Sequence, residues 1–277
     1  MIHRLNEADP RVVVALKRTR VSTENLDLWR AAGLPLNEEG RLAGNVLAPD
    51  AHENQYHTEE VVVYGLLRLL CKIVNLCADD GANDNNTMTA SRSQTEQQGD
   101  AWNLASSELD AWYNALPASF QSELALPFSK DIGDSPHPVS RKCFSSETWF
   151  PNPICAVGMA YYHMARMLLV IQRPVFLMPA QRHFDLLRAY RELQYELQGS
   201  ATKIFAIALG HMEESVRLRL LQPLYVAGRC LMDPQERGIL VKMLRTIEVE
   251  LGVATAYRVR DLLDEWGAAE EELDVPP

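Results

Sequence analysis

Apolar residues recur along this chain at steps of three and four, and this spacing constrains the fold more than any other feature of the sequence. Between Thr58 and Cys77 it predicts a helix that is buried on most of its circumference, with apolar side chains at Val62, Leu66, Leu69, Leu70, Ile73, Leu76 and Cys77. The same spacing predicts further helices at 101–116, 153–172, 180–198, 201–210, 213–231, 234–251 and 254–266. No stretch alternates apolar and polar residues over the length of a strand. We therefore predict an all-α fold, an irregular multi-helix bundle.

Capping residues mark the ends of several predicted helices. The clearest start is at Asp233, an N-cap followed by Pro234 at the first helical position and Glu236 at the third. Glycines favour helix C-termini, so Gly252 is expected to end this helix and Gly199 to end an earlier one. These boundaries are therefore predicted from capping chemistry as well as from periodicity.

Two polar stretches interrupt the helical pattern. Residues 78–100 contain no aromatic and no β-branched aliphatic side chain, so they cannot bury enough surface to offset chain entropy. A second stretch, about 129–148, is rich in Ser, Pro and Asp. We predict a partly helical N-terminal segment over 1–50, followed by a helical domain over 51–277. Within this domain the two stretches are predicted to be long, flexible linkers that are disordered or irregular. The domain ends in an acidic tail at 268–277.

The charge of the chain argues against a free-standing nucleic-acid binder. The formal net charge is −10, whereas proteins that bind nucleic acids need basic surfaces to neutralise phosphates. The densest basic run consists only of Lys17, Arg18 and Arg20. No direct DNA binding is expected from this chain.

The most apolar stretch, Ile154–Ile171, has His163 and Arg166 near its middle. A membrane-spanning helix requires about 20 predominantly apolar residues without such charges. The N-terminus does not lead into the apolar core of a secretory signal. We therefore interpret 154–171 as part of a buried helix and expect no membrane partner.

The cysteines indicate neither a disulfide framework nor a zinc site. Their number is odd and none forms a C-x-x-C pair: Cys71, Cys77, Cys143, Cys155 and Cys230. Most lie in apolar, helix-like surroundings. We interpret them as reduced, mostly buried thiols of a nucleocytoplasmic protein.

Searches for catalytic motifs are negative. The chain has no H-E-x-x-H, no G-x-S-x-G and no glycine-rich phosphate loop. Asp79, Asp80 and Asp84 are close in sequence, but they fall in the first polar stretch, where no rigid carboxylate face is expected to hold Mg²⁺. We predict that the chain is not an enzyme and assign it no catalytic, metal-binding or cofactor-binding residue.

Aromatic residues give a weaker indication. Trp102 and Trp112 share one predicted helix, while Trp149 and Phe150 precede the entrance of another. They could line a ligand cavity between helices, but packing anchors are the favoured interpretation. His163 is likewise interpreted as a hydrogen-bonded core histidine rather than a ligand-pocket residue. Ligand-binding residues are therefore left unknown.

The tail mixes acidic and apolar side chains: Glu270, Glu271, Glu272, Leu273, Asp274 and Val275. Such mixtures occur in disordered activation segments. A solvated, frayed helix end explains the composition equally well.

Several stretches together carry a family resemblance. They are LWRAAGLPL at 28–36, WNLASSELDAWYNALPASF at 102–120, TWFPNPICAVGMAYYHMARMLLVIQRP at 148–174, LQPLYVAGRCL at 221–231 and ERGILVKMLRTIEVELGVATAYRVRDLLDEWG at 236–267. In this order they resemble the C-terminal region of fungal zinc-cluster transcription factors, the fungal-specific transcription factor domain. The resemblance covers most of the chain apart from the two linkers.

The resemblance implies a nuclear regulatory or effector domain that acts on RNA polymerase II genes. Its implied partners are the transcriptional machinery or co-regulator proteins, and a small-molecule effector is also possible. Zinc is expected only in the family's N-terminal six-cysteine DNA-binding cluster. Neither the number nor the spacing of the cysteines in this sequence permits that cluster, so no cofactor is expected in this chain. An all-helical enzyme of terpene-cyclase-like type and a helical protein-interaction scaffold remain alternatives.

Overall fold

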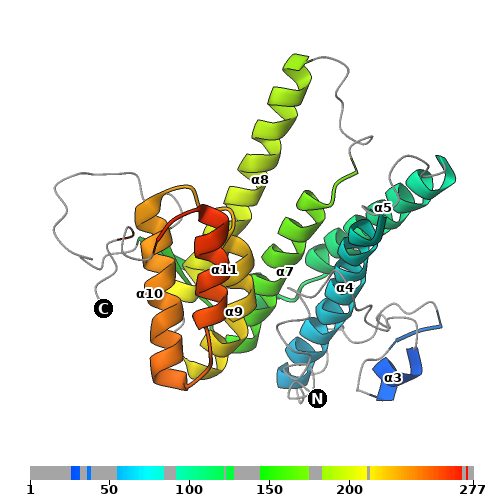
Figure 1. Ribbon diagram of the computed structural model, residues 1–277. Coiled ribbons are helices and arrows are strands. Elements are labelled where there is room, and N and C mark those ends of the chain that lie inside the picture. Colours follow the sequence, from blue (N-terminus) through cyan, green and yellow to red (C-terminus); the bar gives the residue numbers. More distant parts are fainter. Residues whose placement is uncertain are drawn as a thin grey trace. The chain divides into compact units, whose positions relative to one another are not determined.

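The computed structural model describes residues 26–31, 36–38, 55–83, 92–121, 123–127, 144–174, 183–210, 213–269 and 273. These residues are mostly helical, which confirms the predicted all-α fold (Figure 1). The chain divides into two compact units, one formed by 1–121 with 168–189 and the other by 122–167 with 190–277. Helices α7 and α8 contribute residues to both units.

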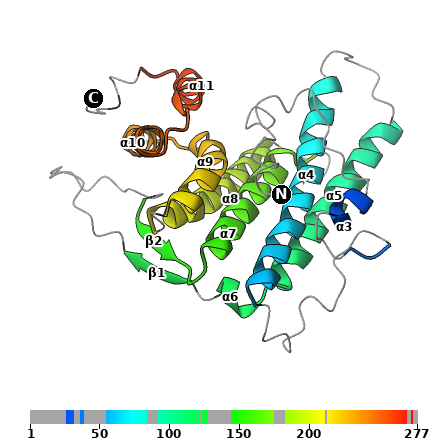
Figure 2. The ribbon, with the colours of Figure 1, turned by 90° about the horizontal axis from the view of Figure 1, so that it is seen from below.

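The elements of the first unit are α3 (Leu26–Ala31), α4 (Gln55–Asn83), α5 (Arg92–Asn114) and α6 (Ala118–Gln121). Helices α4 and α5 lie side by side (Figure 2). The buried indole of Trp112 on α5 donates a 2.9 Å hydrogen bond from Nε1 to the carbonyl oxygen of Val62 on α4. The indole also meets the ring of Phe120 edge-on, at 6.2 Å between centroids. Trp112 therefore joins three elements of this unit.

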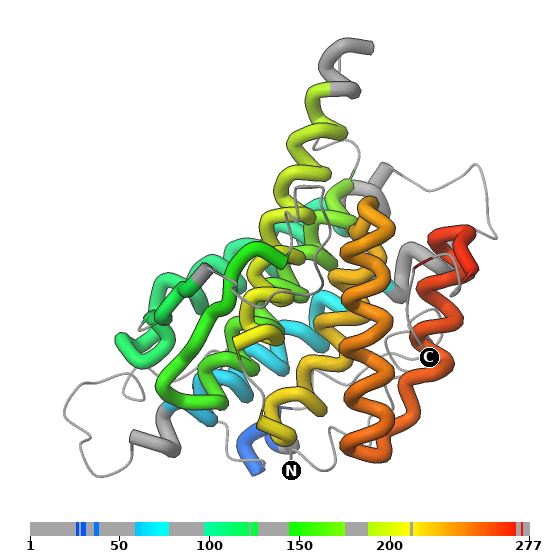
Figure 3. Tube along the Cα trace, turned by 90° about the vertical axis from the view of Figure 1, so that its left-hand side faces the viewer, coloured from blue at the N-terminus to red at the C-terminus, as the bar shows by residue number. Residues whose placement is uncertain are grey.

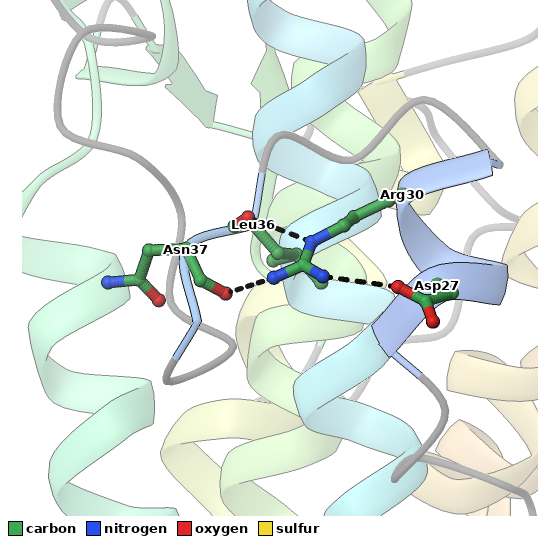
Figure 4. Close-up of polar contacts among 4 residues, drawn as sticks. All are labelled: Asp27, Arg30, Leu36 and Asn37. Atoms are coloured by element: carbon green, nitrogen blue, oxygen red, sulfur yellow. Dashed lines mark hydrogen bonds and ion pairs between the residues drawn. The ribbon is translucent and has the colours of Figure 1, made fainter.

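A small buried cluster and the hydrogen bonds of Arg30 hold α3 in the first unit. Trp29 and Leu36 form a small buried cluster. Three partly buried side chains pack against it: Leu26, Tyr64 and Cys71. Arg30 donates from Nε to the carbonyl oxygen of Leu36 and from Nη2 to that of Asn37, and its Nη1 pairs with Asp27 (Figure 4). Because Asp27 is largely exposed, this ion pair adds little stability, and the two carbonyl contacts hold Leu36 and Asn37 against α3.

The second unit contains β1 (Leu124–Pro127), β2 (Ser146–Trp149), α9 (Glu214–Gly228), α10 (Pro234–Leu251) and α11 (Ala256–Trp266). It shares α7 (Pro153–Ile171) and α8 (His183–Gly210) with the first unit. The strands pair antiparallel, with Leu124 opposite Trp149. On α8, the ring of Phe205 is fully buried and lies 4.5 Å from that of Phe144, which precedes β2.

Helix α7 is long and apolar enough to cross a membrane by length and composition alone. However, 67% of this stretch is buried within the fold, as in the core helix of a globular domain. The predicted burial of this helix is confirmed.

Several predicted boundaries change. Helix α4 continues to Asn83 and α5 starts at Arg92, so helices occupy both ends of the stretch predicted as the linker 78–100. Helical hydrogen bonding can continue through polar residues, whereas the prediction relied on apolar side chains. Gly199 does not end a helix, because α8 continues through it to Gly210. A helix tolerates one interior glycine at a cost of about 1 kcal/mol relative to alanine.

The structure describes the C-terminal end of the stretch predicted as a linker over about 129–148. Phe144 and Thr148 are buried there, and β2 begins at Ser146. The sequence of β2, SETW, does not alternate apolar and polar residues, so it lacks the pattern that predicts strands. Most of the partly helical N-terminal segment predicted over 1–50 lies outside the described residues, and the division at residue 50 stays a prediction.

Other helix ends follow the sequence. The side chain of Asp233 accepts a 2.7 Å hydrogen bond from the backbone N–H of Gln235, so the predicted N-cap of α10 is confirmed. Gly252 ends α10 in the left-handed conformation, with φ at 67°. These two residues therefore set the length of α10, as predicted.

Candidate functional site

Helices α9, α10 and α11 pack against one another in the second unit (Figure 3). They meet at Gly228, the last residue of α9. A Cβ atom added there would collide with the Leu240 side chain on α10 and would lie 3.4 Å from the methyl carbons of Leu262 on α11. Both leucines are fully buried. The absence of a side chain at Gly228 therefore lets the three helices meet this closely.

Trp266, the last residue of α11, links this helix to the other two. Its Nε1 donates a 3.2 Å hydrogen bond to the carbonyl oxygen of Gly228. The guanidinium of Arg237 on α10 lies 5.0 Å from the centre of the indole, within the range of a cation–π interaction. Arg237 also donates from Nε to the carbonyl oxygen of Leu231, at 3.0 Å. These contacts fix the point from which the C-terminal tail leaves α11.

The tail then turns away from the axis of α11. Gly267 is left-handed, with φ at 61°, and the N–H of Ala268 bonds the carbonyl oxygen of Leu263. Both features are typical of a glycine-terminated helix. Further along, Leu273 is buried, and its carbonyl oxygen lies 2.7 Å from where a Cβ atom on Gly238 of α10 would be. Leu273 is thus in contact with α10. We call this contact, between Leu273 and Gly238, the tail seat.

Polar groups between α9 and α11 support the packing of the two helices. Buried Arg258 donates from Nη2 to Oε1 of Gln222, at 3.2 Å. Arg229 pairs with Glu265 at 2.7 Å. Burial raises the pKa of the Tyr225 phenol above its ordinary value, so this group stays protonated at neutral pH. We infer a structural role for these contacts.

The structure places the predicted aromatic residues in packing contacts. Trp102 donates from Nε1 to the carbonyl oxygen of Leu169 at 2.8 Å, and Trp112 is buried as described above. Phe150 is buried, whereas Trp149 is 40% exposed and donates from Nε1 to Glu147. These contacts fit the favoured interpretation of packing anchors. No ligand-binding residue is assigned.

Only some of the candidate metal ligands and thiols lie within the described residues. Asp79 and Asp80 lie in α4 rather than in a loop, and Asp84 lies outside the described residues. Within the described ranges, no three His, Cys, Asp or Glu side chains gather as metal ligands would. Burial raises the pKa of Cys71 to about 11, which keeps this thiol protonated. Cys155 is buried as well.

His163 lies on α7 beside Tyr162, with 5.2 Å between the ring centres. Burial, together with the positive charges of Lys203 and Arg166, lowers the pKa of its imidazole from the ordinary 6.5 to about 3. The folded protein therefore holds a neutral His163, whereas the unfolded chain binds a proton below about pH 6.5. Stability from this group is present above pH 6.5 and is lost as the pH falls toward 3.

We expect the free energy of unfolding of the wild type to fall by about 1 kcal/mol more than that of His163→Gln between pH 7.5 and pH 5.5. Urea unfolding at the two pH values measures this difference. Comparison with the variant removes the contribution of other titrating groups. An equal pH dependence of both proteins would contradict the neutral state of His163 in the folded protein.

Sequence reasoning missed the residues that build the helix junction and the tail seat. Gly238 interrupts an otherwise regular helical pattern, and an isolated glycine in such a pattern indicates close packing when it does not mark a helix end. The sequence alone could therefore have indicated close packing at Gly238. The pairing of Arg237 with Trp266 joins residues far apart in the sequence, and no local pattern indicates it.

Taken together, the fold and the junction define an all-α protein in which α9, α10 and α11 meet at Gly228 and Leu273 packs against α10. Over 90% of its length the chain is similar to the "Transcription activator AMTR1" of Alternaria alternata, with 30% identity over 260 residues. The alignment covers 33% of that protein, so the chain spans about a third of the length of this relative. The chain is therefore homologous to part of a fungal transcription activator. No protein-family model matches the chain, and no solved structure does.

Proposed function

We propose that the chain is the non-catalytic regulatory part of a fungal transcription regulator that acts on RNA polymerase II genes in the nucleus. The observation that carries this proposal is the similarity to a transcription activator, which extends over 90% of the chain and so includes most of both units. The order of segments that resembles the fungal-specific transcription factor domain supports the same function. The similarity favours regulation over a helical enzyme or a passive scaffold.

The chain's own residues limit how it can act. The sequence does not contain the six-cysteine zinc cluster, and its net charge is −10. We therefore assign it neither zinc binding nor sequence-specific DNA binding. In this proposal DNA recognition is supplied by another element, and the chain contributes contacts with the transcriptional machinery or with co-regulators.

Tethering tests this function directly. When the full chain is fused to an unrelated DNA-binding domain, expression of a reporter gene carrying the matching site is expected to change severalfold. The DNA-binding domain alone is the baseline, and the core variant Phe205→Ala, produced at a matched level, reports whether the folded chain is required. Reporter output equal to the baseline, neither raised nor lowered, would reject the proposed function.

A further inference from the structure

One face of the two-stranded sheet is apolar and exposed. Residues opposite each other in an antiparallel pair have their side chains on the same face, and the register places Leu124 beside Trp149 and Leu126 beside Glu147. Leu124, Leu126 and Trp149 are 58%, 44% and 40% exposed. We call the surface formed by these four side chains the sheet face. Apolar side chains that are adjacent at a surface, rather than scattered over it, are typical of interaction sites.

The other side of the sheet is fixed to the second unit. The side chain of Thr148 alternates to that side and is buried. Its carbonyl oxygen occupies the space where a Cβ atom of Gly210, the last residue of α8, would be. Phe144 and Phe150 are buried on either side of β2. The sheet face is therefore presented on a support that is packed into the core.

Charge determines which partner the sheet face fits. Trp149 donates from Nε1 to Oε2 of Glu147 at 3.3 Å, so a half-buried carboxylate lies among the apolar side chains. A second copy of the chain would bring two of these carboxylates together, and like charges facing each other in an interface repel. The net charge of −10 disfavours self-association as well. A partner that carries a lysine or arginine can instead pair with Glu147.

The strands limit the shape of this partner. Pro127 ends β1 and has no N–H to donate, and each strand has four residues, so addition of a further strand at the edge is disfavoured. The partner must then cover side chains rather than pair with the backbone. Positions two apart in a strand, such as Leu124 and Leu126, are separated by about 6.7 Å. Residues i and i+4 of a helix are about 6 Å apart along its axis, so apolar residues at this spacing match the sheet face.

We propose that the sheet face docks an amphipathic helix of a co-regulator. Apolar side chains at i and i+4 of this helix cover Leu124, Leu126 and Trp149, and a lysine or arginine beside them pairs with Glu147. The inference rests on the proposed function, because it names the surface through which the same chain acts and the chemistry of the partner.

Two synthetic peptides test the charge of the partner on the full chain. Both have about 18 residues with leucines at i and i+4 in a helix-forming alanine background, and one carries lysines beside the leucines where the other carries glutamates. The wild type is expected to bind the lysine peptide about tenfold more tightly than the glutamate peptide. Glu147→Lys should lower this ratio severalfold. Asp264→Lys, the same change of charge at an exposed residue of α11, is the matched control, and an equal effect of the two variants would contradict the pairing with Glu147.

Truncation of the apolar side chains tests the sheet face itself. Trp149→Ser and Leu126→Ser are each expected to weaken binding of the lysine peptide about tenfold or more, as the loss of one large apolar contact implies. Val249→Ser is the control, because Val249 on α10 is apolar and 85% exposed. Urea unfolding should show that all three variants stay folded. The proposal is wrong if the wild type does not bind the lysine peptide, or if the three variants bind it equally.

Sedimentation of the full chain tests a second copy as the occupant. We expect no dimer that Trp149→Ser abolishes. Such a dimer would place another copy of the chain on the sheet face and would overturn the docking of a co-regulator.

The tethered reporter connects the sheet face to regulation. Trp149→Ser should move output severalfold toward that of the DNA-binding domain alone, whereas Val249→Ser should match the wild-type fusion. Equal output from the two variants would reject this surface as the docking site of a co-regulator. The proposed function would then still stand if the wild-type fusion differed from the DNA-binding domain alone.

Discussion

Replacing Phe205 with alanine is expected to lower the free energy of unfolding of the second unit by about 3–5 kcal/mol. Phe205 is fully buried on α8, and its ring packs 4.5 Å from that of Phe144. Truncation removes the apolar contacts and leaves a cavity that the surrounding helices cannot fill completely. Because Phe144 precedes β2, the exchange protection of residues 146–149 should fall together with the stability. Urea unfolding and hydrogen–deuterium exchange measure the two effects.

Tyr195→Ala is the matched control for this experiment. Tyr195 is an aromatic residue on the same helix, but it is 81% exposed, so its removal should change the free energy of unfolding by about 0.5 kcal/mol or less. A loss at Phe205 no larger than the loss at Tyr195 would show that the Phe144–Phe205 pair is not part of the core.

Trp112→Ala is expected to cost about 3–5 kcal/mol in the first unit. The indole is buried between α4 and α6, where it contacts Phe120 and donates its N–H to the carbonyl oxygen of Val62. Trp112→Phe retains much of the ring but leaves that buried carbonyl without this donor, so we expect a smaller loss of about 1–3 kcal/mol. Urea unfolding of the two variants separates the contribution of the hydrogen bond from that of the apolar surface.

Tyr113 is the corresponding control, since it neighbours Trp112 on α5 and is 44% exposed. Its replacement with alanine should have a much smaller effect on stability. If Trp112→Phe were as unstable as Trp112→Ala, the hydrogen bond would dominate over packing. If neither variant lost stability, the assignment of Trp112 as a packing anchor would be wrong.

The major helices could be predicted because their local signals agree with their packing. In α10 the periodicity, the cap at Asp233 and the stop at Gly252 all point to the same helix. Gly199 was misread because a glycine in sequence does not reveal whether the helix continues through it. The pairing of β1 with β2 escaped prediction because each strand has four residues and their pairing is set by contacts distant in sequence.

The candidate site was predictable only in part. The acidic and apolar composition of the tail was visible, and it left a frayed end and an interaction segment equally plausible. The burial of Leu273 depends on where the chain turns after Gly267 and on the space above Gly238. Both are properties of packed helices rather than of local sequence. Physical reasoning from the sequence therefore reached the composition of the segment but not its contact with α10.

The division of the chain bears on how its activity should be mapped. Neither unit is a continuous stretch, because residues 168–189 belong with the first unit and 122–167 with the second. Any single cut between residues 121 and 190 removes helices from at least one unit. Lost output in a conventional deletion series would then report misfolding rather than the position of an activating element. Point substitutions, or a truncation within the tail after α11, leave the helices of both units complete and can be interpreted directly.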